Sequence, residues 1–79
     1  MLLSVEYQQP LEELDIICDS AGLDALINHL CQLKQHGGHL HLMTPSWAGT
    51  ELTEIRFNET ALLINHVRIA FLPNRDEQK

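Results

Sequence analysis

The sequence is poor in cysteine, basic residues and long apolar runs. Its two cysteines, Cys18 and Cys31, are too few for a disulfide-rich scaffold and lack zinc-ligand spacing, so we expect two buried thiols. Five basic residues stand against eleven acidic ones, and a net charge of -6 has the wrong sign for binding a nucleic-acid backbone. No apolar run approaches the ~18 residues that span a bilayer, and the first residues do not resemble a signal peptide. We therefore expect a cytoplasmic protein with neither a nucleic-acid nor a membrane partner.

The length of 79 residues has room for one domain. We expect an α+β domain over residues 1–73 and a disordered tail over residues 74–79, which carry nothing to bury. A domain of this size removes only about 60% of its unfolded surface from water. A homodimer, which would bury more, therefore remains open.

Acidic residues gather in the first third of the chain. Six of them precede the first basic residue, Lys34: Glu6, Glu12, Glu13, Asp15, Asp19 and Asp24. Such a surface can steer a basic partner, and it can equally serve only to keep a small protein soluble.

Apolar periodicity predicts the element order β-β-α-β-β-β. Period-2 alternation predicts strands over residues 3–7, 14–18, 39–44, 52–57 and 61–72. A stripe at helical spacing is expected to face the core: Leu23, Leu26, Ile27, Leu30 and Cys31. Asp19 or Ser20 can cap this helix, and Gly37 and Gly38 can end it. The fold class is thus α+β, a two-layer, mostly antiparallel sheet of about five strands with one amphipathic helix on one face.

One helix leaves the second face of such a sheet free for water or for a partner. The residues assigned to that free face are His39, His41, Met43, Glu54, Arg56, His66 and Arg68. Their clustering depends on strand order, which periodicity does not give.

The strand histidines are the candidate metal ligands. His39 and His41 share one strand face about 7 Å apart, and His66, or else Glu51 or Glu54, could add a third ligand. Alternating polar residues are equally typical of a solvated strand face, so metal binding is the weak alternative and we expect no cofactor. No nucleophile turn, Gly-rich phosphate loop or H-E-x-x-H motif is present, and we expect no enzyme activity.

Trp47 is the only tryptophan and lies in a loop between Pro45 and Gly49. The favoured interpretation is a ring folded back to close one end of a small core. The alternative is an exposed anchor of an interface, a role that suits a large ring with few rotamers.

The segment H-L-H-L-M-T-P-S-W-A-G-T-E-L, from His39 to Leu52, resembles the motif of the bacterial immunity protein 32 family. Residues 19–23, the Gly37-Gly38 pair and residues 66–69 are similar to the same family, so the resemblance covers most of the chain. Ala48 stands where the family is expected to favour glycine.

The resemblance implies a small cytoplasmic protein of a polymorphic toxin system, encoded beside a toxin that it binds and neutralises. It brings no established functional residues. If the toxin is a nuclease, acidic side chains could occupy its phosphate site. The residues themselves suggest Trp47 as a partner-binding anchor, with these contacts around it: Glu51, Glu54, His39, His41 and His66. A self-associating accessory or regulatory module is the alternative, and a metal-binding protein or enzyme using the strand histidines is the third.

Overall fold

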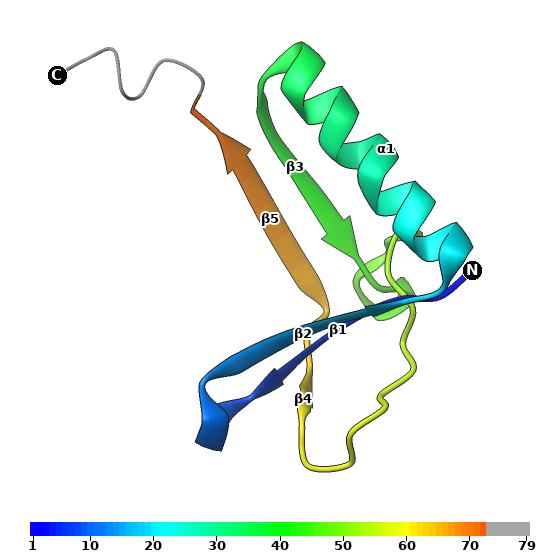
Figure 1. Cartoon of the computed structure of the whole chain (residues 1–79), viewed down its shortest axis with the longest axis vertical. Helices are drawn as coiled ribbons and strands as arrows, with labels where there is room; N and C mark the ends of the chain where they lie inside the picture. The colour runs from blue at the N-terminus through cyan, green and yellow to red at the C-terminus, as the bar shows by residue number, and fades with distance from the viewer. Residues whose placement is uncertain (73–79) are drawn as a thin grey trace, which may run out of the picture.

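The fold consists of one helix and two antiparallel sheets (Figure 1). The computed structural model describes residues 1–72, and in this range its elements are β1 (Leu3–Gln8), β2 (Glu13–Cys18), α1 (Ser20–His36), β3 (Gly38–Met43), β4 (Leu62–Leu63) and β5 (His66–Phe71). Two 3-10 turns, η1 (Gln9–Leu11) and η2 (Pro45–Trp47), follow β1 and β3. The α+β class, with one helix and five antiparallel strands, is confirmed, but the strands form two sheets, β2-β1-β4 and β3-β5, and the last two strands are not the ones predicted. The expected tail over residues 74–79 lies outside the described residues.

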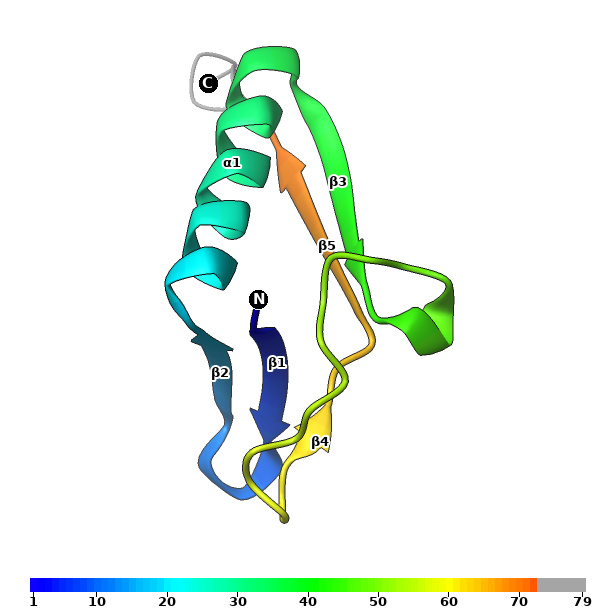
Figure 2. The ribbon, with the colours of Figure 1, turned by 90° about the vertical axis from the view of Figure 1, so that its right-hand side faces the viewer.

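The start and end of α1 follow the expected signals. The Asp19 carboxylate accepts hydrogen bonds from the N–H groups of Gly22 and Leu2, at 2.8 and 3.0 Å, and so joins the helix to β1. Gly37 and Gly38 end the helix with φ of 74° and 83°, a region that favours glycine. Between these two ends, α1 lies beside the β3–β5 sheet (Figure 2).

The core lies where the two sheets meet next to the helix. Its buried members are Leu3, Val5, Leu42 and Leu52. Leu26 of α1 packs against them, whereas Leu23, Ile27, Leu30 and Cys31 are exposed. The expectation that the whole helical stripe and the Cys31 thiol are buried is therefore wrong, because the apolar arc of α1 is wider than the sheets beneath it. The other thiol, Cys18, is half-buried against the core.

Residues 52–57 do not form the predicted strand. β4 pairs with β1 only at Glu6 and Tyr7, and at Leu3 the carbonyl accepts the Thr53 N–H at 2.7 Å. Beyond this single backbone bond the segment crosses a face of β1, where side chains hold it. Thr53 Oγ1 accepts from the Leu3 N–H at 2.8 Å, and Ser4 Oγ donates to the carbonyl of Ile55 at 2.7 Å. The buried Glu6 carboxylate accepts the N–H groups of residues 57 and 58. This face of β1 is covered. On the opposite face of the same sheet, Leu14, Ile16 and Leu62 stay more than half exposed, so the β3–β5 sheet is not the only one with an uncovered region.

The predicted strand over residues 61–72 is broken into β4 and β5, which belong to different sheets. The break falls at Asn65, whose carbonyl and side-chain oxygens accept the N–H and hydroxyl of Thr44 at 3.0 and 2.7 Å. Asn65 therefore bonds to the end of β3 instead of continuing the ladder with β1. Within residues 1–72, no helix has the length and apolar character needed to cross a membrane.

Candidate functional site

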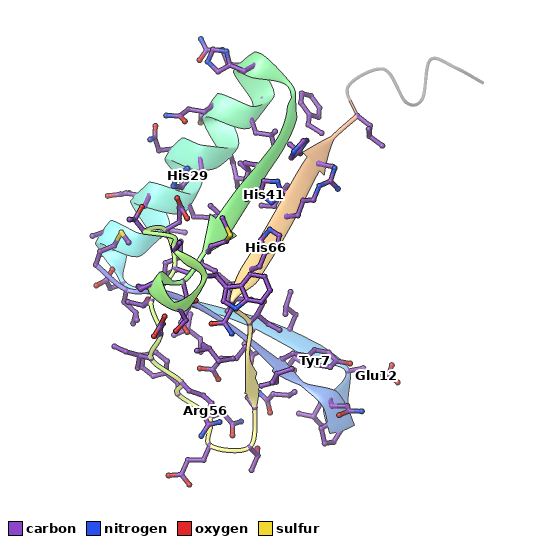
Figure 3. The ribbon with its side chains drawn as sticks, turned by 180° about the vertical axis from the view of Figure 1, so that it is seen from behind. Tyr7, Glu12, His29, His41, Arg56 and His66 are labelled. Carbon is purple, nitrogen blue, oxygen red and sulfur yellow. The ribbon has the colours of Figure 1, made fainter. Side chains whose placement is uncertain are left out.

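Three histidines gather on the outer face of the β3–β5 sheet. Along β3, His39 and His41 alternate with Leu40 and Leu42, which face the core. The antiparallel register sets Met43 opposite His66 and His41 opposite Arg68, which brings these side chains to one face. Figure 3 shows His41 and His66 close together on this side. We call His39, His41, His66, Arg68 and Trp47 the histidine face.

A direct hydrogen bond joins two of these imidazoles. His41 Nδ1 lies 2.6 Å from His66 Nε2, and the two rings stack with centroids 4.8 Å apart. Because one nitrogen must accept the bond, at least one of the two imidazoles is neutral. Partial desolvation lowers the pKa of His41, and the positive charges of its neighbours on the face, His66 first, lower it further.

The spacing of the histidine nitrogens suits a shared proton better than a metal. Two nitrogens bound to one tetrahedral zinc lie about 3.4 Å apart, given Zn–N bonds of about 2.1 Å. The 2.6 Å between His41 and His66 is the length of a hydrogen bond. Within residues 1–72, no group of three or more His, Cys, Asp or Glu is arranged to hold a metal ion.

Trp47 lies beside the histidines on the surface. The turn η2 is closed by hydrogen bonds to the Thr44 carbonyl from the N–H groups of Trp47 and Gly49, both 2.9 Å long. The indole is 55% exposed, and its centroid lies 5.8 Å from that of His66. The favoured interpretation of Trp47 as a core ring is therefore wrong, because the turn points the indole toward His66 and away from the core.

The two candidate glutamates hold the loop that carries Trp47. Glu51 Oε1 accepts from the Met43 N–H at 3.0 Å, and Glu54 accepts from the N–H of Ser46. The bond from Met43 lowers the pKa of Glu51, and bonds from the Ser46 side chain and then from its N–H lower the pKa of Glu54, because they favour the charged carboxylates. The structure thus brings the three histidines and Trp47 together, while the carboxylates of Glu51 and Glu54 bond to the loop backbone.

Apolar periodicity does not identify Arg68 and Asn65 as residues of this site. Arg68 was expected on the free face but was not singled out, although the register places it opposite His41. Asn65 sets where β5 begins and so positions His66. The sequence does contain a signal for the strand break: an asparagine, which is disfavoured in strands, interrupts an apolar run.

A hollow of 190 Å³ lies beside the site, between the end of α1 and the start of β3. Ligand pockets are usually larger than about 300 Å³. The exposed, aromatic histidine face is more typical of a protein-binding surface than of a small-molecule pocket.

Comparison with known families supplies the identity. No curated protein and no solved structure matched the chain. The model of the family described as immunity protein 32 matches residues 13–67, well over half of the chain. This range runs from β2 to the start of β5 and includes the turn with Trp47 and all three histidines of the face. The chain therefore belongs to the immunity protein 32 family.

Proposed function

We propose that the protein binds and neutralises a cognate bacterial toxin in the cytoplasm, and that it does so without catalysing a reaction. Membership of an immunity protein family supports this role. The observation that carries the proposal is the exposed Trp47 indole, which a closed turn holds beside His66. A restrained aromatic ring loses little entropy on binding, which makes it a good anchor.

The groups around Trp47 can supply polar contacts to the toxin. Imidazoles donate or accept hydrogen bonds, and the Arg68 guanidinium pairs well with carboxylates. We therefore propose that polar contacts to the toxin around the Trp47 anchor are made by His39, His41 and His66. Glu51 and Glu54 act mainly by holding the loop in the conformation that presents the indole.

Glu6 is buried, but the exposed acidic residues of the first third of the chain, among them Glu12, Glu13 and Asp24, support steering of a basic toxin surface. On β2, the pKa of Glu13 is raised by its hydrogen bond with Asp15 and by repulsion from the same carboxylate. A cationic partner would relieve this repulsion, and association should therefore slow as salt is added.

Coexpression with the toxin encoded by the adjacent gene tests the proposal. The wild-type chain should copurify with the toxin and protect the cells. A folded Trp47→Ala variant should lose protection, whereas Phe57→Ala, which removes a comparably exposed ring outside the histidine face, should keep it. If the wild-type chain gives neither a complex nor protection, the proposed function is wrong. Self-association as an accessory module is then the alternative.

A further inference from the structure

A row of apolar side chains on α1 is left about half exposed by the described residues. Leu23, Ile27 and Leu30 are 48%, 50% and 42% exposed, although they recur at the spacing of one helix face. Lys34 continues the same row by one more turn. We call these four residues the helix stripe.

The helix stripe continues into an apolar hollow next to β5. Leu30 and Lys34 line it from the helix, and Ile69 and Phe71 line it from the strand. Its volume is 340 Å³. The buried Leu33 also lines this hollow, whereas Leu26, on another face of α1, packs against the core. The stripe can therefore be covered without disturbing the core.

We propose that the helix stripe is a homodimer contact, in which α1 of a second copy packs antiparallel against it about a two-fold axis. In this arrangement the axis passes between Ile27 and Leu30, so that each Ile27 packs against Leu30 of the other copy. The Lys34 methylenes then cover the partner's Leu23, and the Lys34 ammonium reaches the partner's Asp24.

Charge favours a second copy as the occupant. Asp24 and Lys34 are the only Asp, Glu, Lys or Arg residues of α1, and they lie ten positions apart, toward opposite ends of the helix. In an antiparallel dimer, Asp24 of each copy meets Lys34 of the other, so the same ion pair forms twice, as a two-fold symmetric interface requires. Two chains of net charge -6 repel each other as a whole. At the stripe this repulsion is smallest, because each copy brings one acidic residue, Asp24, and one basic residue, Lys34. The antiparallel helix dipoles add to this complementarity.

Sedimentation velocity of the full chain over a range of concentrations tests the dimer. The mass should rise from 9.0 kDa toward twice that value as concentration increases. Ile27→Asp should weaken the dimer by about tenfold or more, because it places a carboxylate in the apolar contact. Gln32→Asp adds the same charge to the far side of the helix and should leave the dissociation constant near that of the wild type.

A charge exchange tests the predicted pairing. Asp24→Lys and Lys34→Asp should each weaken the dimer, and the double variant should restore it, since the pair is rebuilt with its signs reversed. Both positions are exposed, so these variants keep the test valid even if Ile27→Asp fails to fold. A wild-type chain that stays at 9.0 kDa throughout, or a dimer that none of these changes weakens, overturns the proposal. The proposal is also overturned if the wild-type chain is a monomer and Ile27→Asp abolishes its toxin binding, since the stripe would then be a toxin contact.

Discussion

Gly22 shows how closely the start of α1 approaches β1. A Cβ atom at this position would lie 1.6 Å from the Leu2 carbonyl oxygen, which no side chain can tolerate. Replacing an interior helix glycine by alanine usually stabilises a helix by about 1 kcal/mol. Here we expect the reverse: Gly22→Ala should lower the free energy of unfolding by about 1–3 kcal/mol, measured by urea denaturation, because the helix must shift away from β1.

The control for Gly22→Ala is Asn28→Ala, at an exposed position of the same helix. It should change stability by only a few tenths of a kcal/mol, through helix propensity. A Gly22→Ala variant as stable as the wild type would contradict the close contact.

His41 gives the histidine face a defined pH dependence. Its pKa is lowered in the folded chain, by desolvation first and then by the charge of His66 and its other neighbours. The unfolded chain therefore takes up the proton first as pH falls. The contribution of His41 to stability is complete above the ordinary imidazole pKa and is lost as pH falls from there through the lowered value. Titration of the imidazole C–H signals by NMR should show this low pKa, and His66→Ala should raise it.

A His41 signal that titrates at or above the ordinary imidazole pKa would contradict this electrostatic account. His36→Ala is the matched control. His36 lies at the end of α1 and is not among the groups that lower the pKa of His41, so its removal should leave that pKa unchanged.

At the scale of elements, the turn η2 carries backbone strain at Ala48. Ala48 ends the turn with φ of 63°, in the left-handed region that costs an L-residue about 1–2 kcal/mol. Glycine avoids that cost but loses about 0.5–1 kcal/mol more backbone entropy on folding. Ala48→Gly should therefore raise the free energy of unfolding by about 0.5–1 kcal/mol, whereas Ala21→Gly in α1 should lower it by about 1 kcal/mol. A loss of stability in Ala48→Gly would show that the alanine methyl group contributes packing to the turn.

The sequence predicts elements well where local patterns determine them. Alternation located β1, β2 and β3, and the capping residue Asp19 with the glycine pair located α1. Residues 52–57 alternate as well, but they make one backbone bond to β1, from Thr53 to Leu3, and side-chain bonds of Ser4 and Thr53 stand in place of a ladder, which alternation does not reveal. The break at Asn65 likewise depends on Thr44, twenty-one positions away.

The candidate site was predictable in its residue types and less so in its geometry. Alternation placed His39 and His41 on the outer face of their strand, but their contact with His66 requires the non-local register of β3 with β5. Glu51 and Glu54 were expected to face a partner. Local hydrogen bonds to the backbone of residues 43 and 46 hold them in the loop, which charge patterning cannot detect.

At the scale of the whole molecule, two uncovered surfaces lie on different sides of the β3–β5 sheet. Strand alternation sends the histidines outward and Leu40 and Leu42 toward the core, next to α1. The histidine face is open because the helix covers the other side, and the helix stripe is open because the sheets do not span the full apolar arc of α1. The proposed toxin contact and the proposed dimer contact are thus separate surfaces of one small chain.

This separation predicts that the two surfaces act independently. Trp47→Ala should abolish protection from the toxin and keep the wild-type dissociation constant of the dimer, and Ile27→Asp should weaken the dimer and keep toxin binding. Because the sites share no contacts, their effects should add in the double variant within about 0.5 kcal/mol. Sedimentation velocity measures the first quantity and titration of purified toxin into each variant measures the second. A double variant whose toxin affinity departs from the sum of the single effects would mean that dimerisation shapes the histidine face, for instance through β5, which borders both the face and the hollow beside the stripe.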